Sequence, residues 1–162
     1  MTPTERFVFL LCQKLFLSLW SVANPQGKTP KQELCDVLVV CEPDIIIFSV
    51  KEIHYRASDD VETGWQRWTS RAIEASAKQI YGAERILSLL AEVKVRDGSA
   101  TVKLPPKSIR RVHRVAVALG SKGEVPIKFG DLGKGYVHVF DEAAVSVLLR
   151  ELDTITDFVD YL

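Results

Sequence analysis

Apolar residues gather into two short runs in the first third of the chain. The runs, residues 37–41 and 45–50, are rich in β-branched side chains, which favour β-strands. Glu42-Pro43-Asp44 separates them and is typical of a tight turn. The pattern predicts a β-hairpin with a two-residue loop at Pro43-Asp44.

Polar residues stand at one end of this predicted hairpin. In that register Asp36 lies opposite Lys51, and Leu38 lies opposite Ser49. Directly opposed residues share a face of a sheet, and so do alternate residues along a strand. Asp36, Ser49 and Lys51 are therefore predicted to converge on one side. A longer loop of three residues would place Asp36 opposite Val50 and separate the group, unless a bulge restored it.

The rest of the chain predicts helices alternating with strands. Helical periodicity predicts helices over about residues 4–18, 63–93 and 141–162, with Asp141 capping the last. Strands are predicted at residues 19–23, 112–119 and 136–140, with a short one at 127–129. Residues 54–62 are predicted to form a polar loop, and the basic stretch 94–111, which contains Pro105-Pro106, to be irregular. This order predicts one α/β domain over residues 1–162.

Composition changes this picture little. The chain has 162 residues, 47% hydrophobic and 26% charged, which suits a single soluble domain with one core. Cys12, Cys35 and Cys41 lie in apolar runs without a C-x-x-C pair, so we expect reduced thiols in a cytoplasmic protein. The most apolar opening stretch, residues 7–20, is interrupted by Gln13-Lys14 and is too short to span a membrane. A membrane is therefore not expected as a partner.

Charge is balanced overall but uneven along the chain. The formal net charge is zero. Residues 94–134 hold ten Lys or Arg against three Asp or Glu, whereas residues 136–162 hold one Arg against six acids. This asymmetry permits an anionic partner on one side. The G-x-S-x-G and H-E-x-x-H motifs and the glycine-rich phosphate loops do not occur in the sequence.

Asp36 and Lys51 support two interpretations. They are either an ion pair at the end of the sheet, which is worth little when exposed, or part of a metal site. In a metal site the carboxylate would hold a divalent cation, and the lysine would orient a water or offset negative charge. Gln79 is the single large polar residue on the apolar stripe of the long helix. It is either a buried amide satisfied by backbone groups or a side chain that points at that site.

These residues resemble the core of the PD-(D/E)XK nuclease superfamily, in which an Asp begins one strand and a (D/E)-x-K tripeptide ends the next. Asp36 matches the Asp, and Ser49-Val50-Lys51 takes the place of the tripeptide. Glu33 is similar to an accessory acid of some branches, and Gln79 to a glutamine on the following helix. Ser49 departs from the pattern, since the family usually carries a second carboxylate there. The resemblance implies a restriction-endonuclease-like fold, an α-β-β-β-α-β core whose central mixed sheet is flanked by helices.

The resemblance also implies metal-assisted hydrolysis of phosphodiester bonds in DNA or RNA. Asp36 would ligate Mg²⁺ or Mn²⁺, with the Val50 carbonyl as a further ligand, and Lys51 would act on the water or the phosphate. Glu33 would supply the missing carboxylate only if the chain bends, because in a regular strand it points away from Asp36. Phosphate contacts are expected from the basic residues Lys107, Arg110, Arg111 and Arg114.

Two alternatives stay open at this point. Without a second carboxylate the fold could serve as a non-catalytic module that binds nucleic acid or a protein partner. The other alternative is an unrelated α/β interaction domain in which Asp36 and Lys51 form a surface pair. The apolar C-terminal helix could also support a homodimer.

Overall fold

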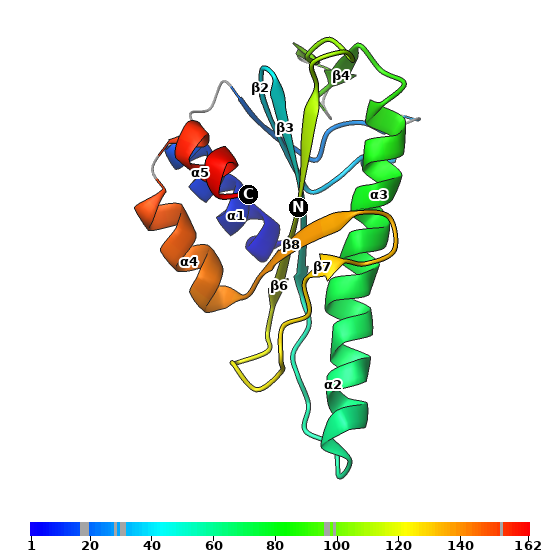
Figure 1. Cartoon of the computed structure of the whole chain (residues 1–162), viewed down its shortest axis with the longest axis vertical. Coiled ribbons are helices and arrows are strands. Elements are labelled where there is room, and N and C mark those ends of the chain that lie inside the picture. Colours follow the sequence, from blue (N-terminus) through cyan, green and yellow to red (C-terminus); the bar gives the residue numbers. More distant parts are fainter. Residues whose placement is uncertain (17–19, 28, 30–31, 96–97, 99, 153) are drawn as a thin grey trace.

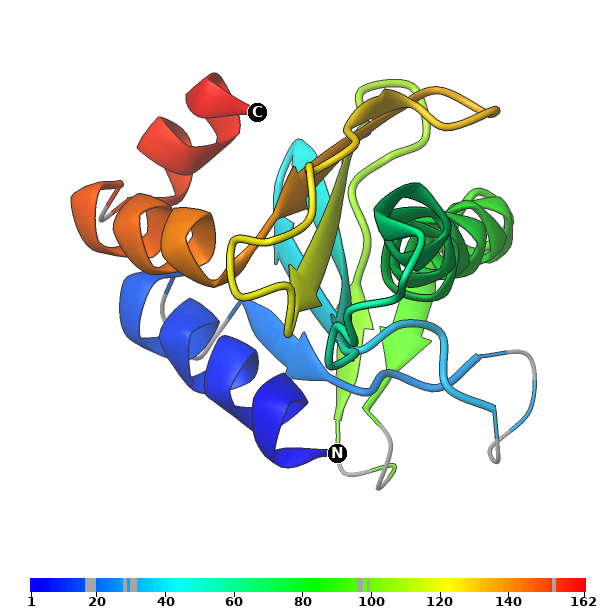
Figure 2. The same cartoon turned by 90° about the horizontal axis from the view of Figure 1, so that it is seen from below.

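The computed structural model describes residues 1–16, 20–27, 29, 32–95, 98, 100–152 and 154–162. These residues form three layers, with a mixed sheet between two groups of helices (Figure 1, Figure 2). The predicted α/β class, with a central mixed sheet flanked by helices, is confirmed, and the restriction-endonuclease-like topology stays a prediction. Within the residues described, no helix is both long enough and apolar enough to cross a bilayer.

The sheet is built from β1 (Ser21–Ala23), β2 (Val37–Cys41), β3 (Asp44–Glu52), β6 (Arg111–Leu119), β7 (Gly130–Asp131) and β8 (Tyr136–Phe140). In the described residues its order is β1-β2-β3-β6-β8-β7. β1, β2 and β3 pair antiparallel, β3, β6 and β8 pair parallel, and β7 pairs antiparallel with β8. β3 is central, and its first seven residues are buried, as expected for a strand covered on both faces.

Helices cover both faces of the sheet. One face carries α1 (Pro3–Phe16), α4 (Glu142–Glu151) and α5 (Ile155–Tyr161) (Figure 1). The other carries one long helix, made of α2 (Val61–Thr69), the π-helical turn η1 (Ser70–Glu74) and α3 (Ala75–Leu87) (Figure 2). The long helix passes over the centre of the sheet, and it therefore controls what the side chains on that face can contact.

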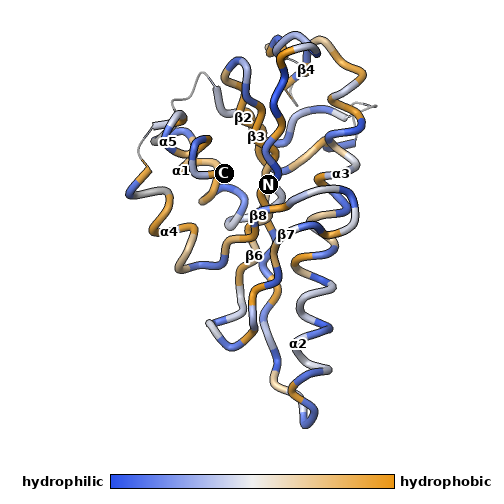
Figure 3. The backbone as a smooth tube through the Cα atoms, in the orientation of Figure 1, coloured by the Kyte–Doolittle hydropathy of each residue, from blue (hydrophilic) through white to orange (hydrophobic). Residues whose placement is uncertain are grey.

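Alternation along the strands gives each face its own core. Leu38 and Ile47 pack with the apolar residues of the long helix. Val39 and Phe48, one position further along each strand, pack with those of α1, α4 and α5. Figure 3 shows hydrophobic residues concentrated along the strands, between the two helical layers. The sheet is therefore the interior of the molecule, and a polar side chain on it needs a partner there.

The β2–β3 hairpin differs from the predicted register by two residues. Its loop is Glu42-Pro43, because Asp44 already belongs to β3. The Asp44 carboxylate accepts hydrogen bonds from Arg111 Nη2 (2.7 Å) and His113 Nε2 (2.8 Å) on β6. These contacts between strands hold Asp44 in the sheet, and they could not be read from the turn sequence.

Two predicted pairings across the hairpin are therefore wrong. Leu38 pairs with Ile47 instead of Ser49, and the same shift moves Asp36 two positions away from a pairing with Lys51. Side chains alternate along a strand, so a shift of two leaves each one on its predicted face. Asp36, Ser49 and Lys51 thus still share the face that the long helix covers.

Other elements also differ from their predicted bounds. The stretch 94–111 is not irregular throughout, because β4 (Glu92–Lys94) and β5 (Thr101–Lys103) form a separate antiparallel hairpin before the two prolines. No strand forms at the described residues 127–129, and pairing starts instead at Gly130. The C-terminal helix is divided, because Thr154 Oγ1 accepts a bond from the N–H of Asp157 (3.1 Å) and caps α5. Positions 17–19, where the first predicted helix and strand meet, lie outside the described residues.

Candidate functional site

The polar residues at the end of β3 meet one side chain from the long helix. Asp36 is only 5% exposed, and its Oδ2 accepts a hydrogen bond from the N–H of Val50 (2.6 Å). Its Oδ1 accepts from Gln79 Nε2 (3.1 Å). Gln79 Oε1 accepts in turn from Ser49 Oγ (3.1 Å) and Lys51 Nζ (3.3 Å). We call Asp36, Ser49, Lys51 and Gln79 the Asp36–Gln79 cluster.

Three parts of the fold bring this cluster together. Asp36 directly precedes β2, Ser49 and Lys51 are two apart on β3 and share a face, and Gln79 lies on α3 above that face. Of the two interpretations of Gln79, the one that points it at the predicted site is correct, because its amide binds side chains rather than backbone groups. The π-helical turn η1 ends five residues before Gln79, and such turns are frequent at functional sites.

The electrostatics of the cluster centre on Asp36. Burial raises the pKa of its carboxyl above the ordinary value of 3.8, and the hydrogen bonds from Val50 and Gln79 and the charge of Lys51 oppose that rise. The charge of Glu5, on α1, raises the Asp36 pKa further, so a second carboxylate lies within electrostatic range. The sequence did not single out Glu5, because an acid in the first turn of a helix is expected there. A cation that approached Asp36 would favour its charged form.

Of the other predicted ligands, Glu33 is bound elsewhere. Its Oε1 accepts a hydrogen bond from Asn24 Nδ2 (2.6 Å). Val50 contacts Asp36 through its N–H, and a metal-binding role for its carbonyl stays a prediction. Nowhere in the described ranges do three His, Cys, Asp or Glu side chains gather as a metal site. The cluster offers oxygen donors from one carboxylate and one hydroxyl, and oxygen is the ligand type that Mg²⁺ takes.

Three of the four basic residues predicted to contact phosphates bind the protein itself. Arg110 donates to the carbonyls of Leu87 (2.6 Å) and Pro105 (2.7 Å), Arg111 pairs with Asp44 (2.7 Å), and Arg114 makes two 2.6 Å bonds to Glu84. Lys107 is exposed. Arg111 lies far from the cluster. It pairs with the first residue of β3, and Lys51 lies seven residues, or about 23 Å, further along that strand. Contacts to a substrate at the cluster must therefore come mainly from other residues.

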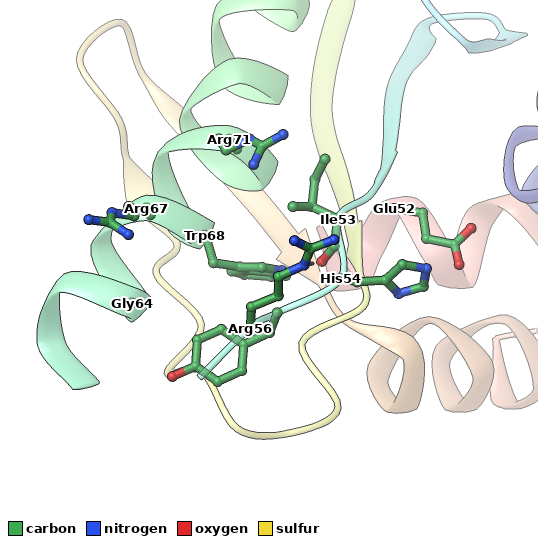
Figure 4. Close-up of a pocket in the computed structure, with 9 residues that line it drawn as sticks. Glu52, Ile53, His54, Arg56, Gly64, Arg67, Trp68 and Arg71 are labelled. Atoms are coloured by element: carbon green, nitrogen blue, oxygen red, sulfur yellow. Dashed lines mark hydrogen bonds between the residues drawn. The ribbon is translucent and has the colours of Figure 1, made fainter. Parts of the chain in front are cut away.

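A pocket of about 500 Å³ opens where the chain leaves β3 (Figure 4). Three arginines line it: Arg56 from the segment after β3, and Arg67 and Arg71 from the long helix. The other lining residues are Glu52, Ile53, His54, Tyr55, Gly64 and Trp68. We call this the arginine pocket. The sequence places Arg67 and Arg71 one helical turn apart, where a solvated face was the simpler interpretation, and only folding brings Arg56 beside them.

Comparison with known proteins adds no relative to this picture. No protein-family model, curated protein sequence or solved structure matches the chain. The functional conclusion therefore depends on the residues themselves.

Proposed function

We propose that this protein is a metal-dependent nuclease that hydrolyses phosphodiester bonds of DNA or RNA. The observation that carries the proposal is the convergence of Asp36, Ser49, Lys51 and Gln79 in one hydrogen-bonded cluster at the end of β3. These are the residues that resemble the PD-(D/E)XK pattern. An exposed ion pair, the simpler alternative, does not account for a carboxylate that is 5% exposed.

The donors of the cluster are compatible with Mg²⁺ or Mn²⁺. Asp36 would hold the cation through its carboxylate, with the Ser49 hydroxyl as a further oxygen donor. The Gln79 amide oxygen is not a further ligand, because it accepts hydrogen bonds from both Ser49 and Lys51. Mg²⁺ keeps several of its waters and needs only one or two carboxylates, so a single acid suffices to hold it. When bound, the cation supplies the charge that polarises a phosphate and lowers the pKa of a water. Glu5 is the better candidate for a second carboxylate, because its charge already reaches Asp36, whereas Glu33 is bound to Asn24.

Lys51 and Gln79 have different tasks in this proposal. Lys51 is half-buried, so its ammonium can reach a phosphate oxygen beside the cluster and offset the negative charge that develops there. Gln79 positions both charged groups, because its nitrogen holds Asp36 and its oxygen holds Lys51. Ser49 is fully buried and donates to the Gln79 oxygen, which fixes the orientation of the amide.

Cleavage of labelled single- and double-stranded DNA and RNA, in Mg²⁺ and in Mn²⁺, tests the proposal. Asp36→Asn and Lys51→Gln should each abolish metal-dependent cutting. Lys103→Gln is the matched control, because Lys103 is exposed and lies far from the cluster. It belongs to β5, which pairs with β4 at the top of Figure 1, whereas the chain leaves β3 toward α2 at the bottom. Cutting that survives both substitutions in the cluster, or a wild type that cuts nothing, contradicts the nuclease proposal.

A non-catalytic module that binds nucleic acid is the second candidate. One observation favours it: Asp36 is the one carboxylate in the cluster, and Ser49 occupies the position where the resemblance implies another acid. Such a module would bind oligonucleotides without cutting them, and its melting temperature would not rise with Mn²⁺. Thermal unfolding with and without Mn²⁺ therefore separates the two candidates, since a ligand that binds the folded state stabilises it.

A further inference from the structure

The arginine pocket carries more positive charge than its surroundings neutralise. Arg56 and Arg71 make no hydrogen bond or ion pair with any of the residues that the structure describes. Arg67 is partly balanced, because its charge acts on the carboxylate of Asp60. Glu52 is the acid among the lining residues, and its Oε2 already accepts a bond from the Thr4 hydroxyl. Two guanidinium groups thus face the pocket with their hydrogen-bond donors unused.

The walls of the pocket are held in place before any ligand arrives. The segment after β3 continues to pair with β6, through Ile53 N–H to the Leu119 carbonyl (2.9 Å) and Tyr55 N–H to the Gly120 carbonyl (2.8 Å). Trp68 Nε1 donates to the Ile53 carbonyl (2.6 Å), which ties the long helix to the same segment. The backbone of the pocket therefore needs no ordering when a ligand binds, and only the arginine side chains lose rotamer freedom.

The chemistry of the pocket favours a phosphate group. Guanidinium groups bind phosphate through pairs of parallel N–H bonds, and they keep their charge at any physiological pH. Trp68 is only 3% exposed, so it forms the floor and does not offer a face on which a base could stack. Figure 4 shows Arg56 and Arg71 over this floor, on the side of the pocket near Ile53. The arginines therefore recognise the charge of a phosphate, a contact that carries no base identity.

The position of the pocket relates it to the Asp36–Gln79 cluster. Glu52 and Ile53, which line the pocket, directly follow Lys51 on the chain. On the long helix Arg71 precedes Gln79 by eight residues, or about 12 Å. Successive phosphates of one strand in duplex DNA are separated by about 3.4 Å along the helix axis. The pocket and the cluster are thus close enough for one nucleic acid strand to contact both.

We propose that the arginine pocket binds a backbone phosphate of a nucleic acid strand that passes over the Asp36–Gln79 cluster. The identity of the strand rests on the proposed function, but the contact itself requires neither metal nor cleavage. Arg56 and Arg71 grip the phosphate, and Arg67 adds attraction at longer range. The pocket sets the position of the strand without reading its sequence.

Fluorescence anisotropy in EDTA measures this contact without catalysis. The probes are fluorescein-labelled single-stranded DNA, duplex DNA and RNA of about 20 nucleotides, longer than a typical single-strand site. The double variant Arg56→Gln/Arg71→Gln should bind at least about tenfold more weakly than wild type. Its salt dependence should be shallower by roughly 0.7–0.9 in log–log slope, because the pocket no longer neutralises one phosphate. The control Lys103→Gln should bind like wild type. Thermal melting confirms that both variants fold.

The outcomes also distinguish this inference from the nuclease proposal. Binding that depends on Arg56 and Arg71 in a protein that never cuts supports the inference and contradicts the nuclease. Unchanged binding by the double variant, or equal weakening in the Lys103→Gln control, overturns the inference even if the protein cuts DNA. A wild type that binds inorganic phosphate in calorimetry but none of the oligonucleotides also overturns it, because the ligand is then a free anion.

Discussion

Replacing Gln79 with Ala would measure how much the Asp36–Gln79 cluster contributes to stability. The substitution removes the amide that bonds Asp36, Ser49 and Lys51. Lys51 is half-buried and can turn to water, but Ser49 is fully buried and Asp36 is 5% exposed, so both lose a partner that water cannot easily replace. A buried polar group left without its partner costs about 1–3 kcal/mol. Two such groups sum to about 2–6 kcal/mol. Because Asp36 keeps its bond from the Val50 N–H, we expect the free energy of unfolding to fall by about 3 kcal/mol, in the lower half of that range.

The loss should appear as a melting temperature lower by about 6–12 °C, since 1 kcal/mol corresponds to about 2–4 °C in a protein of this size. Circular dichroism measures the melting temperature, and urea unfolding gives the free energy. Gln66→Ala is the matched control, because Gln66 is exposed on α2 of the same long helix. The same change of side chain there should alter the free energy by about 0.5 kcal/mol or less.

The pH dependence separates the bond to Asp36 from a general loss of packing. Gln79 lowers the pKa of Asp36, so removing it should raise that pKa further above the ordinary value of 3.8. A carboxyl whose pKa is raised on folding contributes stability below its unfolded pKa and loses it as the pH rises through its folded pKa. The loss in free energy of unfolding that Gln79→Ala causes, relative to wild type, should therefore grow from acid to neutral pH. A variant that melts like Gln66→Ala, or a deficit that is equal at every pH, would refute this reasoning.

Three further predictions concern metal binding, pH and backbone geometry. Ser49→Asp places a second carboxylate beside Asp36, so the variant should be less stable than wild type in EDTA. Its melting temperature should rise more than that of wild type when Mn²⁺ is added, and an equal rise would count against a metal site. Asp36→Asn removes a carboxyl whose pKa is raised by burial, so the free energy of unfolding of the variant should increase relative to that of wild type as the pH rises above 3.8. Urea titrations measure this difference, and a difference that does not change with pH would contradict the prediction. Gly120→Ala should lower the melting temperature more than Gly123→Ala. Both glycines have positive φ, +92° and +74°, so both substitutions strain the backbone. Only at Gly120 would the new Cβ also meet the Ile53 carbonyl oxygen, at 2.5 Å. Equal losses would show that this close approach is unimportant.

The faces of the strands could be predicted from sequence, and the pairing between them could not. Alternation of apolar residues fixed the side on which Leu38 and Ile47 lie, whatever the register. The register itself depends on Asp44, which is held by two residues of a strand nearly seventy positions later. The β4–β5 hairpin was missed for a different reason. Its strands are three residues each, too short for a clear period, and the nearby Pro105-Pro106 ends the hairpin instead of preventing it.

The same limit applies to the candidate site. Asp36, Ser49 and Lys51 could be grouped from their spacing, and Gln79 stood out because it is polar on an apolar stripe. Local charge could not show which arginines are available. Arg114 lies in the most basic part of the chain but is paired with Glu84, thirty residues away. Arginine residues that remain unpaired, as in the arginine pocket, are identified only when the packing is known.

The electrostatic cost of Asp36 is a second reason to assign its cluster a function. The carboxyl is buried and its pKa is raised, and among the described side chains its link to Lys51 runs through Gln79 rather than through a direct ion pair. A neutral residue at this position would avoid that cost, since a buried charge without a direct counter-ion generally destabilises a fold. Groups held in such surroundings are concentrated at functional sites, where a ligand offsets the cost. If Asp36→Asn proves as stable as wild type at neutral pH and loses cutting or metal binding, the charge of Asp36 serves the ligand and not the fold.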